Sequence, residues 1–130
     1  ILETQLLNKI LNKNYSNSSE PVIIIYGENW HEGIIGIIAA RVKEKFNKPT
    51  IIISVISDLG KGSARSIYGF DIGSVIIGAV QAGLLVAGGG HKMAAGFTID
   101  MKKIDEFKEF VLRKFKSINL NLEDKKKILF

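Results

Sequence analysis

Two runs of β-branched residues, with an apolar segment of helical length between them, constrain the fold most strongly. Residues 21–26 (Pro-Val-Ile-Ile-Ile-Tyr) and residues 50–56 predict two buried strands. Residues 33–46 have the length and apolar density of a helix packed on a sheet, and residues 47–49 (Asn-Lys-Pro) supply a stop. Strands that alternate with helices predict an α/β fold with a mixed, mostly parallel β-sheet flanked by helices.

The same alternation continues through the rest of the chain. Apolar residues recur at helical spacing near both ends, and Asp71 is a suitable N-cap for a further helix. We therefore expect helices over residues 2–13, 72–86 and 102–115 and strands over residues 62–67 and 94–99.

The glycines divide the chain into a specialised middle and plain flanks. All 13 glycines lie between Gly27 and Gly96, together with both histidines and the single tryptophan. Glycine permits positive φ and close approach of the backbone, so function is expected in this middle part. We divide the chain into a helix with a polar linker (residues 1–20), one functional domain (residues 21–116) and a tail (residues 117–130) that is a linker or the start of a further domain.

Composition and charge exclude several classes of protein. With 46% hydrophobic and 24% charged residues, the 130-residue chain has the mix of one globular domain. It has no cysteine, which excludes disulfides, thiolate metal sites and cysteine nucleophiles. Its 18 Lys and Arg against 13 Asp and Glu give a net charge of +5, which suits a polyanionic partner. The uncharged segment 72–90 holds six glycines in 19 residues and makes a poor membrane helix, so we expect no membrane partner and a cytoplasmic location.

The first of three candidate binding motifs contains Trp30 and His31. They lie between the end of a strand and the start of a helix, where ligands and anions bind in open α/β sheets. His31 could donate to a phosphate there, and Trp30 could wall the pocket. The alternative is that Trp30 fills the edge of the core and His31 only caps the helix.

The second motif is Gly-Lys-Gly-Ser-Ala-Arg-Ser, residues 60–66. Strand alternation places Ser63 and Arg65 on one face and Ala64 and Ser66 on the other. A hydroxyl beside a guanidinium suits a bidentate phosphate contact, and both serines are candidate phosphate ligands. A solvated hairpin is the alternative, and the run lacks the spacing of a Walker loop.

The third motif is Gly88, Gly89 and Gly90 followed by His91. Consecutive glycines cost backbone entropy on folding and therefore indicate a geometric need. We expect a loop that forms a nest of N–H donors for an anion, with His91 against a phosphoryl oxygen. The alternative is a tight turn with a satisfied histidine.

Arginine is rare, and its positions add to these motifs. Only three of the 18 basic residues are arginine, and two of them, Arg41 and Arg65, lie in the middle part. Both are candidate phosphate ligands, because arginine differs from lysine at forked contacts; a snorkelling side chain or a buried ion pair with a glutamate of the helix is the alternative for Arg41. The aspartates are scattered, and neither histidine pairs with both a serine and a carboxylate. The chain is thus equipped to hold a phosphodiester rather than to cut it.

Taken together, the motifs resemble the DHHA1 domain of RecJ-type single-strand-specific exonucleases. The resemblance covers residues 21–115 and rests on residues 30–37 (Trp-His-Glu-Gly-Ile-Ile-Gly-Ile), residues 60–66 and the glycine–histidine run 88–96. It implies a 5′-to-3′ exonuclease on single-stranded DNA, with Mn²⁺ or Mg²⁺ held by a separate DHH domain of the same polypeptide. That domain is missing from this sequence, so this chain should hold no cofactor and should not be an enzyme by itself.

The resemblance also implies roles for the matching positions. Arg41, Ser63 and Arg65 would contact phosphates, and His91 with its glycines would lie close to the scissile phosphate. Trp30 and His31 would shape the groove. Residues 1–13 would end the helix that joins the two domains, and residues 117–130 would lead to an OB-type domain. The implied partners are single-stranded DNA and the DHH domain, with a single-strand-binding protein as a further candidate.

Two other hypotheses stay open. The glycine–histidine motif alone marks a wider group, which includes phosphodiesterases acting on short oligonucleotides or dinucleotides and an appended domain of alanyl-tRNA synthetases. A phosphodiesterase should bind a dinucleotide about as well as a long strand. A non-catalytic RNA-binding or oligomerisation module should prefer structured RNA or form a dimer, and it leaves the Gly-Ser-x-Arg-Ser strand unexplained.

Overall fold

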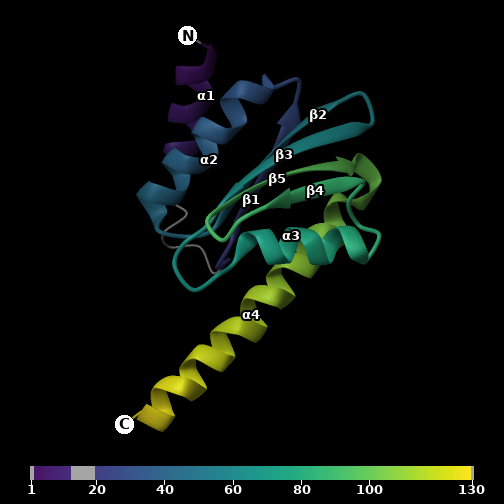
Figure 1. The fold of residues 1–130 in the computed structure, drawn as a ribbon. Coiled ribbons are helices and arrows are strands. Elements are labelled where there is room, and N and C mark those ends of the chain that lie inside the picture. The colour runs from purple at the N-terminus through teal and green to yellow at the C-terminus, as the bar shows by residue number, and fades with distance from the viewer. Residues whose placement is uncertain (1, 13–19, 130) are drawn as a thin grey trace.

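The computed structural model of the chain describes residues 2–12 and 20–129. Four helices and five strands make up this part (Figure 1). The helices are α1 (Leu2–Leu11), α2 (Glu32–Phe46), α3 (Ile72–Gln81) and α4 (Ile104–Leu129), with a 3-10 turn η2 (Met101–Lys103) before α4. The strands are β1 (Ile23–Glu28), β2 (Thr50–Ile56), β3 (Leu59–Arg65), β4 (Ala87–Gly90) and β5 (Ala94–Asp100).

The five strands form one sheet in the order β1-β2-β3-β5-β4. The α/β class and the mixed sheet are confirmed, but the expectation that the sheet is mostly parallel is wrong. Only β1 and β2 run parallel, whereas β2–β3, β3–β5 and β5–β4 are antiparallel. The reason is the length of the connections: a parallel pair needs a long crossover such as α2, and the two- and three-residue turns after β2 and β4 permit only antiparallel neighbours.

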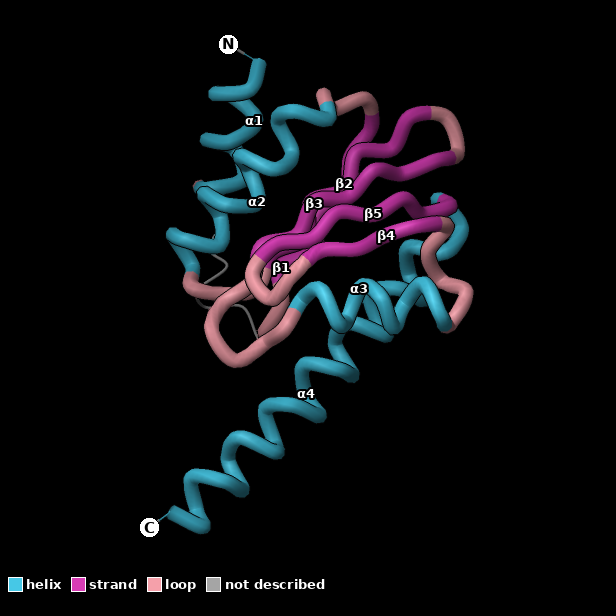
Figure 2. The backbone as a smooth tube through the Cα atoms, in the orientation of Figure 1, coloured by secondary structure: helices cyan, strands magenta, loops and turns pink. Residues whose placement is uncertain are grey.

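Helices cover the two faces of the sheet unequally. One face packs against α3 and α4, with a core that includes Ile53, Phe97 and Phe107. The other face packs against α1 and α2, where α2 lies over β2 and β3 and the core includes Ile23 and Ile52. In the part of the chain that the structure describes, no helix covers β5 and β4 on the α2 side (Figure 2). This uncovered half of the sheet is where a ligand can reach the strands.

Most predicted bounds lie within three residues of those observed, and two larger differences occur at the ends of α3 and α4. Helix α3 ends at Gln81 rather than at residue 86, because Gly83 turns the chain with a φ of +79°. Helix α4 continues to Leu129, so the predicted tail is helical over most of its length. The polar linker predicted before β1 lies mostly outside the described residues. None of the helices in the described ranges is long and apolar enough to cross a membrane.

Candidate nucleic-acid interface

A groove of about 570 Å³ lies on the uncovered half of the sheet, between α2 and strand β4. We call it the sheet groove. Its floor is β3 and β5, and the first turns of α2 form one wall. Polar side chains and bare backbone line most of it: Glu32, Gly33, Ile35, Gly36, Lys61, Gly62, Ser63, Arg65, Ala87, Gly88, Gly96, Phe97 and Thr98.

Ser63 and Arg65 lie on the same face of β3, as strand alternation predicted. Arg65 Nη1 donates to Ser63 Oγ at 3.0 Å and to the carbonyl of Ala64 at 2.9 Å, so the half-buried guanidinium is held over the floor. Helix α2 approaches this pair at Gly36, where a Cβ would lie 3.2 Å from Arg65 Nη2. Both bonds use Nη1, and within the described residues Nη2 and Nε have no hydrogen-bond partner. They are free to bind an anion in the groove.

Lys61 and Thr98 also belong to the groove, although neither was among the predicted phosphate ligands. Lys61 Nζ donates to Thr98 Oγ1 at 2.9 Å across the β3–β5 pair. Alternation along β3 puts Lys61 on the face of Ser63 and Arg65, which was the signal that could have identified it. Thr98 could not be found this way, because its place depends on the register between two strands. Lys61 and Arg65 are four residues apart on β3, which places them about 14 Å apart along the groove at roughly 3.4 Å per residue.

The three consecutive glycines do not form the predicted loop. They make up most of β4, an edge strand that pairs with β5 alone. Gly88 lines the sheet groove, and Gly90 packs so closely on β5 that a Cβ would lie 2.4 Å from the Ala94 carbonyl oxygen. Glycine is therefore required at Gly90, as the sequence indicated, but the reason is close packing between strands. The predicted nest of N–H donors does not form, because these residues are in a strand.

His91 follows β4 in the β4–β5 turn and is exposed. Its N–H donates to the Ala94 carbonyl at 2.9 Å, and Ala94 pairs with Arg65 in the sheet. His91 therefore lies at the end of the sheet where β3 finishes. Arg41 is exposed in the second half of α2, which leads to Thr50, the residue that pairs with Arg65. Of these three predicted phosphate ligands, Arg65 lines the groove, whereas Arg41 and His91 do not.

Trp30 and His31 lie at the opposite end of the sheet, after β1, and both have structural contacts. The Trp30 ring covers Gly27, where a Cβ would overlap it, and the Trp30 carbonyl accepts a hydrogen bond from Ser54 Oγ at 2.5 Å. His31 Nδ1 accepts from the Gly33 N–H at 3.1 Å and caps α2. These contacts agree with the alternative in which Trp30 fills the core edge and His31 caps the helix.

Ser66 is a correction to the predicted phosphate ligands. It is fully buried, and its hydroxyl donates to the Phe70 carbonyl at 2.6 Å. Since Ser66 lies on the face of β3 opposite to Ser63 and Arg65, it does not reach the sheet groove. Its function is to hold the turn that follows β3.

The groove carries no ligand set for a metal ion. Among the described residues, no three histidine, aspartate or glutamate side chains are grouped so that they could hold one. Glu32 is the single carboxylate among the groove residues. In the described ranges the groove therefore offers cations, hydroxyls and peptide groups, which together bind anions.

Comparison with known proteins places this geometry in a family. The single-stranded-DNA-specific exonuclease RecJ of Dickeya dadantii is 37% identical over 90 residues, which are 67% of this chain and 16% of that protein. Manganese-bound RecJ of Thermus thermophilus matches with a TM-score of 0.70 and 30% identity over 86% of this chain and 16% of that one, and its magnesium-bound structure gives the same TM-score. The C-Ala domain of Aquifex aeolicus alanyl-tRNA synthetase, at 15% identity and a TM-score of 0.63 over 72% of this chain and 88% of that one, shares the fold alone.

The chain spans about a sixth of the length of these RecJ proteins. The DHHA1 domain family matches residues 19–117, which include every residue of the sheet groove. This chain therefore belongs to the DHHA1 domain family.

Proposed function

We propose that this chain is the nucleic-acid-binding part of a RecJ-like single-stranded-DNA exonuclease and that the sheet groove binds the phosphate backbone of the strand. The observation that carries the proposal is the Arg65 guanidinium, which Ser63 and Ala64 hold over the groove floor with its remaining donors unused. Charge-assisted contacts from a prearranged guanidinium are strong and suit phosphate oxygens. Lys61, held by Thr98, would contact a second phosphate farther along β3.

The chemical contribution of this part is electrostatic. A backbone threaded along β3 would be oriented by Lys61 and Arg65, and His91 at the end of the sheet would approach the phosphate next to them. Prearranged donors of this kind offset charge that develops on a phosphoryl group during hydrolysis. The Mn²⁺ or Mg²⁺ would be held by a DHH domain of the same polypeptide and would supply the hydrolytic chemistry there.

The wider assignment follows from the same family membership. We propose 5′-to-3′ degradation of single-stranded DNA by the complete enzyme, in DNA repair and recombination in the cytoplasm, with a single-strand-binding protein as a candidate partner. Support comes from the 37% and 30% identities to RecJ proteins and from the cationic groove.

The test is fluorescence anisotropy of a labelled single-stranded oligonucleotide with this chain at two salt concentrations. Binding should weaken with salt, since each phosphate contact releases counterions. Arg65→Ala should weaken the binding about tenfold or more, because it removes a charge-assisted hydrogen bond to phosphate. Arg113→Ala is the matched control, because Arg113 is an exposed arginine on α4, which covers the opposite face of the sheet.

Competitors separate the alternatives. Duplex DNA and a dinucleotide should compete weakly if the groove holds a long single strand. A dinucleotide that competes as well as the long strand would replace the proposal with a dinucleotide phosphodiesterase, and a preference for structured RNA would replace it with an RNA-binding module. Equal affinity of Arg65→Ala and the parent chain would refute the role of the groove.

A further inference from the structure

The turn after β3 presents an aromatic ring to solvent although the turn itself is tightly held. Tyr68, at its tip, is 97% exposed. On either side of it, Ser66 Oγ donates to the Phe70 carbonyl and the Phe70 N–H donates to the Ile67 carbonyl at 3.3 Å. Phe70 is buried and packs edge-on against Phe115, with ring centroids 5.1 Å apart. A turn anchored in this way fixes the place of Tyr68 without covering its ring.

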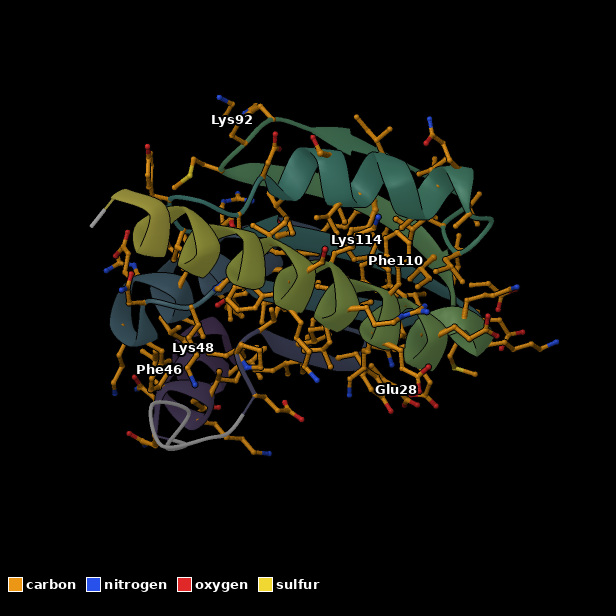
Figure 3. All side chains as sticks on the ribbon, turned by 90° about the horizontal axis from the view of Figure 1, so that it is seen from below. Glu28, Phe46, Lys48, Lys92, Phe110 and Lys114 are labelled. Carbon is orange, nitrogen blue, oxygen red and sulfur yellow. The ribbon has the colours of Figure 1, made fainter. Side chains whose placement is uncertain are left out.

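A second turn lies directly beside this one and adds a cation and a thioether. The Ser66 N–H donates to the Met93 carbonyl at 2.9 Å, which joins the turn after β3 to the β4–β5 turn. Met93 is 41% exposed, and the Lys92 side chain projects away from the body of the domain (Figure 3). A hollow of about 490 Å³ lies at the junction, lined by residues 67–71 together with Lys92 and Met93. We call Tyr68, Lys92 and Met93 the Tyr68 platform.

The platform lies at the end of the sheet where β3 finishes. Arg65 is the last residue of β3 and the groove cation at that end, and Tyr68 follows it by three residues. The carboxylate at the platform, Asp71, is already used as the N-cap of α3, where it accepts from the Ser74 N–H at 3.2 Å and from Ser74 Oγ at 3.0 Å. A strand whose phosphates pass Lys61 and Arg65 therefore leaves the groove at the end of the sheet where Tyr68 and Lys92 lie.

From this placement we propose that the Tyr68 platform stacks a nucleobase of the single strand whose phosphates the sheet groove holds. The inference rests on the proposed function and adds to it the recognition of bases. Aromatic rings combined with cationic grooves are the usual means of binding single strands without sequence preference. Met93 adds a polarisable contact to a ring, and Lys92 adds a charge for the neighbouring phosphate. A duplex would gain no affinity from the platform, because its bases are already stacked inside.

A protein partner is the other class of occupant for an exposed apolar patch, and the observations favour nucleic acid. The patch is small, Tyr68 is its one exposed aromatic ring, and it lies at the end of β3 where Arg65 faces the groove. Lys92 lines the hollow, and Asp71, the one carboxylate among its lining residues, is occupied by Ser74, so the charge of the patch complements a polyanion.

The experiment compares two labelled 12-mers that carry the same phosphates, oligothymidine and an oligomer of abasic tetrahydrofuran sites. The parent chain should bind oligothymidine more tightly. Tyr68→Ala should weaken oligothymidine about 5- to 100-fold, as for the loss of one stacked base, and leave the abasic oligomer unchanged. Tyr68→Phe should keep the parent affinities, because it keeps the ring. Tyr26→Ala, which removes a tyrosine that is 52% exposed on the opposite edge strand β1, is the matched control.

A second readout is the fluorescence of a 2-aminopurine base in the oligonucleotide, which stacking quenches. The parent chain should quench it and Tyr68→Ala should not. Equal affinity of the parent for both oligomers would overturn the inference and leave the groove's grip on phosphates intact. Loss of abasic binding in Tyr68→Ala would also overturn it, since the residue would then act on the groove and not on a base. Failure of the parent to bind either oligomer would refute the proposed function itself.

Discussion

Replacing Gly36 by alanine should stabilise the fold but weaken the binding of single-stranded DNA in the sheet groove. A glycine inside a helix costs roughly 0.5–1 kcal/mol relative to alanine, so the substitution should raise the free energy of unfolding by about that amount if the methyl group fits. The new Cβ would lie 3.2 Å from Arg65 Nη2 and 3.4 Å from Ser63 Oγ. Carbon atoms pack best at about 3.5–4.0 Å, so the guanidinium must move by a few tenths of an ångström. It can do so cheaply, because it is the end of a flexible side chain.

That movement should weaken DNA binding. Displacement of Arg65 disturbs its 3.0 Å hydrogen bond to Ser63, and a hydrogen bond contributes about 0.5–1.5 kcal/mol. We therefore expect a roughly two- to tenfold rise in the Kd for single-stranded DNA. Gly78→Ala is the matched control: Gly78 lies inside α3, and its Cβ would meet Phe110 Cζ at an ordinary 3.5 Å. It should gain similar stability with no change in binding.

The two measurements are urea unfolding followed by circular dichroism and anisotropy with a labelled single strand. If Gly36→Ala gains stability and binds as tightly as the parent chain, the held position of Arg65 has no part in binding. If it loses more than about 1 kcal/mol of stability while Gly78→Ala gains, the contact between α2 and β3 is rigid and the reasoning about a flexible guanidinium is wrong.

Two further substitutions test residues that the structure assigns to folding. Ser66→Ala removes the donor to the buried Phe70 carbonyl and should lower the free energy of unfolding by about 1–3 kcal/mol in urea, and an unchanged midpoint would contradict this assignment. His31→Ala should cost about 0.5–2 kcal/mol through the lost cap of α2, while His31→Asp keeps an acceptor for the Gly33 N–H and should recover most of it; equal losses would rule out the cap.

Local features could be predicted from the sequence where one strand or helix determines them. Strand β2 has the predicted bounds, because a strand buried on both faces is a nearly continuous apolar run, interrupted here only by Ser54 after its first residue. Asp71 caps α3 as expected, since its side chain accepts from the Ser74 N–H. The common face of Ser63 and Arg65 followed from alternation alone. Each of these needs only the residue types along a single element.

Features that depend on how elements meet could not be predicted in this way. The groove joins Lys61 on β3 to Thr98 on β5, and only the register between the strands brings them together. The contact between Gly36 and Arg65 could not be predicted, because it depends on the angle at which α2 crosses β3. Neither segment determines that angle by itself. The glycines from Gly88 to Gly90 suggested a loop, but they form a strand. Consecutive glycines occur both where strands pack closely and where a loop approaches a ligand, and the sequence alone does not distinguish the two.

The glycines of the groove also limit what this surface can recognise. Gly62 permits the Phe97 ring to lie under the floor, where a Cβ would overlap it, whereas a Cβ at Gly96 would meet only the Gly62 carbonyl oxygen, at an ordinary 3.7 Å. Some glycines thus serve packing beneath the strands, and others leave bare backbone above them. A floor of peptide groups with Lys61 and Arg65 at its ends can hold phosphates, but phosphate contacts carry no information about bases. Any dependence of affinity on the presence of bases must therefore arise beyond the groove, and Tyr68 is the exposed aromatic ring at the end where Arg65 stands.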